Sequence, residues 1–294
     1  MTKIVYHSAD HDGKTSGAIL YNHLKNSKGG CSLYGMDYHE TAKIEQFMKE
    51  IGSEDIVYMA DISFKLPQLE ELHKKLGDKF ILIDHHASLI NDLASAGLTE
   101  KIKGLRTTKF AASILCWMYL YPDKDVPKTV EYIGKYDVKD YPPGDDVEKF
   151  HYGLDLLDID PSSPTWTSIL KSEQKFIDEI LITGTKINDY LMIINKDLNR
   201  DRAFERTIEG FKTICINTPQ KGDKVFESVL GKYEMQSIFS HTGKPNTWSV
   251  SFYCNNKLEH VDCSKIAKKY GGGGHKSAAG MTCDFETLRK LFDI

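Results

Sequence analysis

The sequence predicts an α/β fold, with a mostly parallel sheet in an N-terminal domain that a long helix joins to a smaller α/β C-terminal domain. In the first half, strand-like apolar runs alternate with helical patterns, the order expected for parallel strands and crossover helices. In the second half, a long amphipathic segment precedes a new group of short strand-like runs. We place the N-terminal domain at residues 1–165, a helical linker at 166–204 and the C-terminal domain at 205–294.

The expected elements follow one another along the chain. In the first half, the strands are residues 3–9, 32–38, 55–62 and 79–83, and the helices between them are 15–25, 41–51 and 66–76. Further helices are expected at 109–119 and 127–135, and a turn-rich stretch follows them. The segment 166–199 is compatible with one helix or with two in series. Beyond it we expect strands at 213–217, 225–230, 236–240 and 248–253 and a helix at 263–269.

The charge balance limits the class of ligand. Lysine and arginine total 38 residues and aspartate and glutamate total 42, which gives a net charge of −4 at pH 7. Proteins that grip long nucleic acid are usually basic, so we expect no long duplex as a partner. A small phosphate compound at one focused site remains compatible with this charge, because the local field matters more there.

Targeting and redox motifs are lacking in the sequence. Six cysteines occur without a C-x-x-C pair, which argues against a zinc knuckle or a redox motif. The chain starts on a strand-like segment without an apolar signal-peptide core, and no stretch approaches the roughly 18 apolar residues of a membrane span. We therefore expect a cytoplasmic protein with no membrane partner.

A group of metal-ligand residues follows the first predicted strand, in the segment His7-Ser-Ala-Asp10-His11-Asp12-Gly13. Carboxylates and imidazoles this close together can converge on one cation cluster, and an oxygen-rich set suits Mn²⁺ or Mg²⁺ better than a metal that prefers thiolates. The alternative is an Asp-Gly turn in which Asp12 caps a helix.

Similar residues follow the next strands. Asp61 ends an apolar strand, although it could instead cap the following helix. In Asp84-His85-His86, the two histidines are expected to point to different sides of an extended backbone, so that one binds metal and the other faces substrate, while Asp84 orients an imidazole. Asp137 is the weakest candidate by itself. Because sites form where parallel strands end, we expect the residues after the strands to lie together.

A run of glycines lies near the C-terminus, in Gly271-Gly-Gly-Gly274-His275. Such a run allows close backbone approach, and its N–H groups are expected to cradle phosphate oxygens at a helix start. A flexible linker is the alternative. The run lacks the G-K-[ST] ending of a P-loop, which argues against an ATPase.

These five segments, in this order, resemble the DHH phosphoesterase superfamily, in its oligoribonuclease and pAp-phosphatase branch, and the C-terminal part resembles the first type of DHH-associated domain with its GGGH loop. The resemblance implies a catalytic N-terminal domain with two Mn²⁺, although Mg²⁺ or Co²⁺ could replace them. One ion would be held by His7, Asp10 and Asp61, and the other by Asp12, Asp61, His85 and Asp137. His86 and Asp84 would be catalytic, and substrate would contact Gly272, Gly273, Gly274 and His275.

The resemblance also implies an activity. We expect a manganese-dependent phosphodiesterase that hydrolyses short oligonucleotides (nanoRNA) or small nucleotides such as pAp. The alternatives are a phosphodiesterase for cyclic or linear dinucleotides and, outside the enzymes, an inactive nucleotide-binding sensor. The expected partners are short single-stranded RNA or DNA or small nucleotides, and a homodimer remains open. The family more often has a small or apolar residue at the position of His11, and many relatives have a phosphate-binding arginine near the position of Tyr253.

Overall fold

The computed structural model describes residues 1–27, 29–38, 40–142, 144–220, 222–229, 231–255, 258–274 and 276–294. It divides into two compact units, Met1–Ile187 and Asn188–Ile294. The predicted α/β class is confirmed, because the first unit contains a parallel sheet with helices and the second contains a separate sheet with helices of its own. The division falls inside the segment 166–204, for which the sequence predicted a linker.

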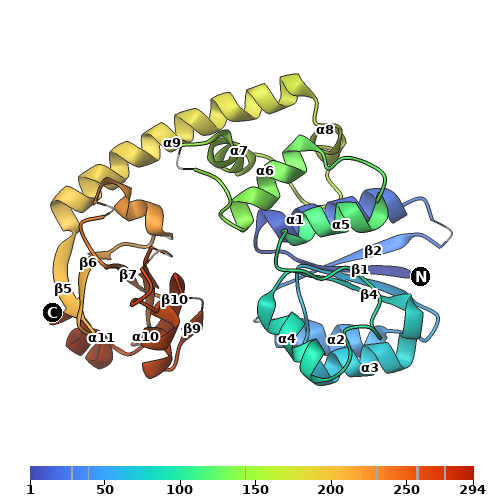
Figure 1. The fold of residues 1–294 in the computed structure, drawn as a ribbon, viewed down its shortest axis with the longest axis horizontal. Coiled ribbons are helices and arrows are strands. Elements are labelled where there is room, and N and C mark those ends of the chain that lie inside the picture. The colour runs from blue at the N-terminus through green and yellow to red at the C-terminus, as the bar shows by residue number, and fades with distance from the viewer. Residues whose placement is uncertain are drawn as a thin grey trace. The chain divides into compact units, whose positions relative to one another are not determined.

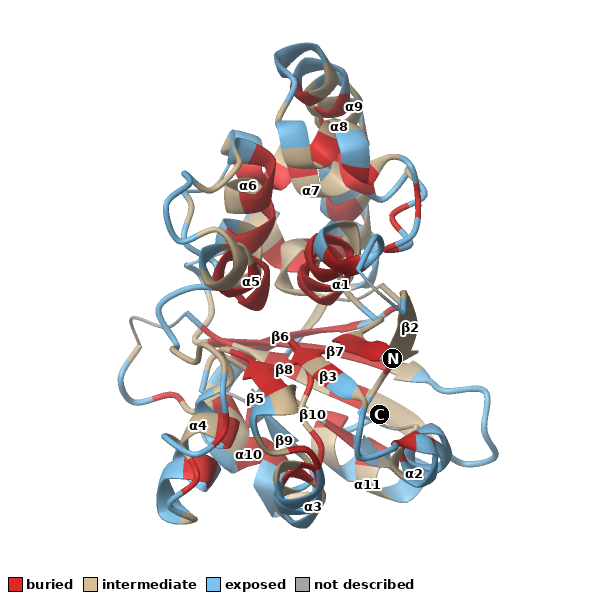
Figure 2. Ribbon diagram, turned by 90° about the vertical axis from the view of Figure 1, so that its right-hand side faces the viewer, coloured by how far each residue is buried: buried red, intermediate tan, exposed pale blue. Residues whose placement is uncertain are grey.

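The sheet of the first unit has the strand order β2-β1-β3-β4, and every neighbouring pair is parallel. Its strands are β1 (Thr2–His7), β2 (Cys31–Met36), β3 (Ile56–Ala60) and β4 (Phe80–Ile83). Strand β1, inside the sheet, is buried over almost its whole length. The edge strand β2 is only partly buried, and its ribbon is mostly tan in Figure 2. Tyr6 pairs with Ala60, and Ala60 pairs with Ile83, so the chain leaves β1, β3 and β4 at the same edge.

Helices cover both faces of this sheet (Figure 1). One face carries α1 (His11–Leu24) and α5 (Ala112–Leu120), and the other carries α2 (Thr41–Glu50), α3 (Leu66–Leu76) and α4 (Ala87–Ser95). The apolar faces of these helices bury two clusters against the strands, one on each side. Helix α1 begins at His11 and not at Thr15 as predicted, because the Asp10 carboxylate caps it by accepting a hydrogen bond from the Gly13 backbone N–H at 2.8 Å. Helix α4 was not predicted.

A further group of helices completes the first unit. It consists of α6 (Lys128–Asp137), α7 (Asp146–Leu154), α8 (Trp166–Lys171) and the start of α9 (Gln174–Arg202). Phe150, Trp166, Ile169 and Ile177 belong to one buried cluster, so residues at the start of the predicted linker are part of this unit's core. A Cβ atom at Gly184 would lie 1.7 Å from the Lys149 carbonyl oxygen, so only glycine permits this close packing of α9 on α7. The predicted turn-rich stretch contains α7.

The second unit is built on a six-stranded sheet of order β5-β6-β7-β8-β10-β9. Its strands are β5 (Phe204–Ile208), β6 (Phe211–Asn217), β7 (Met235–His241), β8 (Trp248–Tyr253), β9 (Gly273–Gly274) and β10 (Ala278–Cys283). Strands β6 and β7 are parallel, and the other neighbouring pairs are antiparallel. Helices α10 (Cys263–Lys269) and α11 (Phe285–Phe292) contribute to a core with Phe239 and Phe252.

Two predictions for this unit are wrong. The expected strand 225–230 is a short 3-10 helix, Asp223–Val229, in the described residues, where Val225 and Phe226 are buried without strand pairing; Leu230 itself lies outside them. The glycine run is not at a helix start, because it follows the C-terminal end of α10 and continues as β9, which pairs with β10. Strands β5, β9 and β10 and helix α11 were not predicted. No helix in the described part of the chain combines the length and the apolar content that a membrane span requires.

Candidate metal centre

A first group of ligand residues lies where β1 and β3 end. His7 is the last residue of β1, Asp10 caps α1, and Asp61 directly follows β3. His7 Nδ1 lies 2.8 Å from Asp10 Oδ2 and 3.7 Å from Asp61 Oδ2. One donor atom from each of the three residues lies within 4.8 Å of the others, which is close enough for a shared cation.

A second group lies on the other side of the Asp61 carboxylate. His85 Nε2 is 3.3 Å from Asp61 Oδ1 and 3.5 Å from Asp137 Oδ2, and Asp12 completes the group. Asp61 therefore directs one carboxylate oxygen toward His7 and the other toward His85. A carboxylate shared in this way can connect two cations, each of which has further ligands from its own group.

The backbone at Asp61 is strained, which the capping alternative does not explain. Asp61 has φ of +58°, in the left-handed region that costs a non-glycine residue about 1–3 kcal/mol, although aspartate tolerates it better than most. The following helix α3 starts at Leu66 with Lys65 as its N-cap, so Asp61 caps no helix there. Asp61 is 2% exposed, and within the described residues its Oδ1 accepts no hydrogen bond. Its nearest donor, His85 Nε2 at 3.3 Å, does not reach it with hydrogen-bond geometry. A buried oxygen in this state fits a ligand that a cation would complete.

Asp12 has a structural contact that the sequence did not predict. Its carboxylate accepts hydrogen bonds from the backbone N–H groups of Ala112 and Ser113, at 2.8 and 3.0 Å, at the start of α5. The helix that Asp12 stabilises is therefore α5, about 100 residues away in sequence, while Asp10 caps α1. These contacts fix the orientation of a buried carboxylate beside Asp137 and His85.

The charges of the two groups are not balanced within the cluster. Burial, followed by repulsion from Asp61 and Asp137, raises the pKa of Asp12 well above its ordinary value. Burial also raises the pKa of Asp137, against the attraction of His85. Burial disfavours the charged form of His7, but its close contacts with the Asp10 and Asp61 carboxylates outweigh this effect and raise the pKa of His7 to about 10. Carboxylates therefore gather here beyond what the imidazoles neutralise.

The donor set fits divalent cations of the Mn²⁺ type. Four carboxylates and two imidazoles form two groups that meet at Asp61, and no thiol takes part among the residues described. Oxygen-rich ligation with some imidazole is typical of Mn²⁺ and Mg²⁺. Two divalent cations would neutralise four carboxylates, which would remove the repulsion that raises the pKa of Asp12 and Asp137.

His86 is held by Asp84 beside these groups. Asp84 Oδ1 accepts a hydrogen bond from His86 Nδ1 at 2.7 Å and one from the His86 backbone N–H at 2.9 Å. Asp84 is fully buried, and its hydrogen bond to His86 raises the pKa of that imidazole. The prediction that His85 and His86 point to different sides is wrong, because their ring centroids are only 4.6 Å apart. His86 is the N-cap residue of α4, and the backbone turns there.

Sequence reasoning missed several residues near this edge. Asp37 and Tyr38 directly follow β2; Asp37 Oδ1 is 3.9 Å from His7 Nε2, and the ring of Tyr38 lies 5.4 Å from that of His7. Both residues lay inside the predicted strand 32–38, which in the structure ends at Met36, so the rule about strand ends would select them only with the correct end of this strand. A further group, His11 with His151 and Asp155, joins segments far apart in the sequence, and no local pattern could have paired them.

The described glycines of the predicted substrate loop are partly explained by packing. A Cβ atom at Gly272 would lie 2.2 Å from the Gly280 carbonyl oxygen, and one at Gly274, whose φ is +139°, would lie 2.5 Å from the Ala279 Cα. At Gly273 an added Cβ would meet nothing within 4 Å. Substrate binding by these glycines stays a prediction, and His275 lies outside the described residues.

Comparisons with known proteins bear mainly on the fold. No family model matches the chain. An uncharacterised protein, R106, of Acanthamoeba polyphaga mimivirus is 25% identical over 295 aligned positions, which include 95% of this chain and 66% of that protein. The chain thus spans slightly less than two thirds of the length of this relative.

Three solved structures have a similar fold. A pGpG-specific phosphodiesterase, PggH, of Vibrio cholerae has a TM-score of 0.57 at 11% identity, with 99% of this chain and 96% of that chain covered. The DHH domain of PF0399, a member of the s1p family of ribosomal proteins, has a TM-score of 0.59 at 15% identity, covering 98% and 84%. An exonuclease RecJ bound to manganese has a TM-score of 0.55 at 13% identity, covering 99% and 87%. The chain therefore has the two-domain α/β fold of RecJ and of these DHH-type structures.

Proposed function

We propose that the protein is a metal-dependent phosphodiesterase that uses two Mn²⁺ ions to hydrolyse short oligonucleotides or small nucleotides. The observation that carries the proposal is the position of Asp61, whose two carboxylate oxygens face two separate groups of ligands. Structures of the same fold include a pGpG-specific phosphodiesterase and an exonuclease bound to manganese, which supports both the reaction class and the metal.

The ligands divide between the two ions. His7, Asp10 and Asp61 would hold one ion, and Asp12, Asp61, His85 and Asp137 would hold the other. When bound, such ions would supply Lewis-acid activation of a water nucleophile and would stabilise the charge that develops on the phosphate. The chain itself must keep the ligands deprotonated and in place, and the hydrogen bonds from the start of α5 to Asp12 contribute to this.

His86 is suited to hold a phosphate oxygen. Asp84 accepts the Nδ1 proton and so fixes the ring, which leaves Nε2 as the ring nitrogen for a substrate. Because Asp84 raises the pKa of His86, it favours the imidazolium form, in which Nε2 donates a hydrogen bond to a negative oxygen. We assign His86 a direct catalytic role and Asp84 a positioning role.

The substrate is proposed to be short. The net charge of −4 disfavours an extended nucleic acid, while the metal centre provides a local site for one phosphate. Short RNA oligonucleotides (nanoRNA) and pAp are the leading candidate substrates. A linear or cyclic dinucleotide is the second candidate, favoured by the likeness to the pGpG-specific phosphodiesterase. We further propose that the protein acts in the cytoplasm.

A substrate panel tests this proposal. The panel contains RNA and DNA from dimers to decamers, pAp, pGpG and a cyclic dinucleotide, each with Mn²⁺, with Ca²⁺ or after exhaustive chelation. We expect hydrolysis of the short substrates with Mn²⁺, much slower turnover with Ca²⁺, which is a weaker Lewis acid of looser geometry, and none after chelation. Equal rates with both ions, or full activity without metal, would contradict the proposal.

A further inference from the structure

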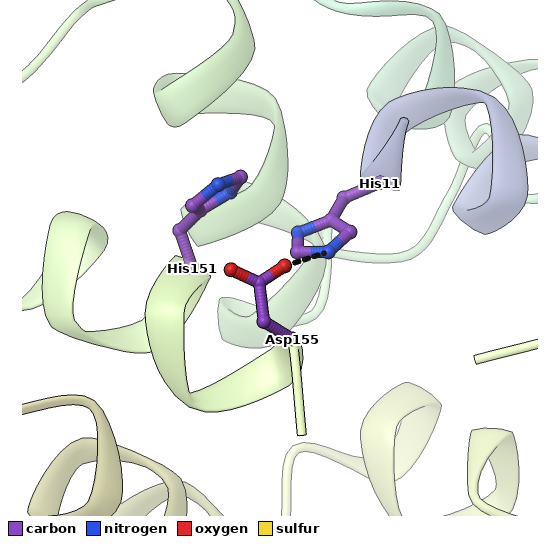
Figure 3. Close-up of side chains that lie close together, drawn as sticks. All are labelled: His11, His151 and Asp155. Carbon is purple, nitrogen blue, oxygen red and sulfur yellow. Dashed lines mark ion pairs between the residues drawn. The ribbon is translucent and has the colours of Figure 1, made fainter. Parts of the chain in front are cut away.

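A second cluster of ligand residues lies between the start of α1 and the end of α7, and the proposed phosphodiesterase centre does not use it. His11 is the first residue of α1, His151 is on α7, and Asp155 is the C-cap of α7. Figure 3 shows the two imidazole rings and the carboxylate pointing toward one another. One donor atom from each residue lies within 4.8 Å of the others.

Helix α7 presents its two ligands in a fixed geometry. His151 and Asp155 are four positions apart, so they lie on the same side of the helix, one turn from each other. Phe150 and Leu154, on the adjoining side of α7, are buried in the core of this unit. A Cβ atom at Gly153 would lie 2.3 Å from the Ile180 carbonyl oxygen, so α7 is packed closely on α9. The pair is therefore organised before any ligand binds.

The ring of His151 is held from its other side. It stacks on Tyr136 with a centroid distance of 3.5 Å and an interplanar angle of 9°. Its contact with His11 is different, since the centroids are 4.4 Å apart and the rings are tilted by 47°. The tilt means that the two imidazoles do not stack flat on each other.

A simple ion pair does not account for the cluster. The contact between His11 Nε2 and Asp155 Oδ1, at 3.0 Å, uses one nitrogen of His11. The other nitrogen, Nδ1, is buried and has no hydrogen-bond partner among the residues that the structure describes. This ion pair also does not involve His151, whereas a cation can bind both rings and the carboxylate.

We propose that His11, His151 and Asp155 form a third cation site, specific for a transition-metal ion of the Zn²⁺ type. Two imidazoles and one carboxylate are a donor set that suits Zn²⁺ and disfavours Mg²⁺ or Ca²⁺, which prefer oxygen ligands alone. The Asp155 side chain is 51% exposed, which provides an entry path and room for water as the fourth ligand. No residue of this site is a proposed ligand of the two-metal centre.

Zinc stoichiometry tests the proposal. Equilibrium dialysis against Zn²⁺, with elemental analysis, is done on the wild type and on the variants His151→Ala and Asp155→Asn. We expect each variant to bind one Zn²⁺ fewer than the wild type. His23→Ala is the matched control, because His23 is an exposed histidine that contacts Tyr121 and lies outside the cluster; this variant should bind as much as the wild type.

The variant Asp61→Asn separates this site from the proposed two-metal centre. Asp61→Asn should lose zinc at the two-metal centre and keep the ion at His11, His151 and Asp155. If Asp61→Asn alone loses zinc, the third site is contradicted, and if only the α7 variants lose it, the two-metal centre is contradicted instead. Circular dichroism checks folding. If His151→Ala does not fold, the test rests on Asp155→Asn, because the exposed side chain at this position tolerates an amide. Zinc binding by Asp155→Asn equal to that of the wild type would overturn the proposal.

Discussion

The strand ends of the first sheet and the glycine run of the second unit both contain unusual residues, but the fold explains only one of them. At the strand ends, Asp61 has a left-handed backbone and a buried oxygen that accepts no hydrogen bond within the described residues, and Asp12 is repelled by its neighbours. These features destabilise the unit. In the glycine run, Gly272 and Gly274 allow close contact with β10, which stabilises the sheet.

This difference bears on how function is inferred from structure. A residue type that packing requires is weak evidence of a site, because the fold would select it without any ligand. Groups that cost stability are stronger evidence, because a fold keeps them only where something else compensates. The structural support for a metal centre at the strand ends is therefore stronger than the support for substrate binding by the glycine run. The following predictions test this difference.

The largest effect is expected for Asp61→Asn. The amide keeps the shape of aspartate and its tolerance of the left-handed region, which alanine would lose. Loss of the shared carboxylate should lower kcat about 100-fold or more, or about 2.7 kcal/mol. The metal-free variant should melt at a higher temperature than the metal-free wild type, because the repulsion with Asp12 is reduced.

Asp37→Asn is the matched control, since Asp37 lies near His7 but is not a proposed ligand. Its kcat should stay close to that of the wild type. If Asp61→Asn kept more than about a tenth of wild-type kcat, a loss below about 1.4 kcal/mol, the bridging role would be wrong.

A smaller effect is expected for Asp84→Asn. Asp84 touches no proposed cation and acts by holding the His86 ring, so its loss should lower kcat about 10- to 100-fold. Bound Mn²⁺ should remain unchanged, and the pKa of His86, followed by NMR in the metal-free protein, should fall because Asp84 raises it. An unchanged pKa would show that Asp84 does not set the state of this imidazole.

The glycine run should respond in stability more than in catalysis. Gly274→Ala introduces a contact with Ala279 at a φ of +139°, and should destabilise the protein by about 1–3 kcal/mol. Gly273→Ala meets open space and should change the free energy of unfolding by less than about 0.5 kcal/mol. Urea denaturation of both variants measures the difference. An increase in KM for dinucleotides in Gly273→Ala, without loss of stability, would support substrate binding by the loop. Equal stabilities of the two variants would contradict the explanation that packing against β10 requires glycine at position 274.

The smallest effect is expected for the pH dependence of metal binding. In the metal-free protein the pKa of His7 is raised to about 10, so the imidazole is protonated at pH 7 and must release its proton to bind a cation. Affinity for Mn²⁺ should therefore rise between pH 6 and pH 8. Calorimetry in two buffers of different ionisation enthalpy measures the proton release, and binding without release would show that His7 is not a ligand.

Much of the fold follows from local patterns. Helices α3 and α10 and strand β8 have the bounds that periodicity predicts, because their apolar residues repeat with one clear period. The prediction of a strand at 225–230 is wrong because a short apolar run is compatible with several kinds of secondary structure. Helix α7 was missed within a stretch rich in turn residues.

The site was predictable where it depends on strand order. Parallel strands end at one edge, which is why His7, Asp61 and His85 could be grouped without a structure. Contacts between distant segments could not be found in this way. The hydrogen bonds from α5 to Asp12, and the approach of α7 to His11, depend on how helices pack on the sheet, which one sequence does not encode in any local pattern.

The central claim is that Asp61 connects two cations, and electron paramagnetic resonance of the manganese-loaded protein tests it most directly. Two Mn²⁺ ions that share the Asp61 carboxylate would be close enough for their spins to couple. We predict the spectrum of a coupled pair in the wild type, with two ions per coupled centre by metal analysis, and its loss in Asp61→Asn. A spectrum of isolated Mn²⁺ ions in the fully loaded wild type would contradict the account.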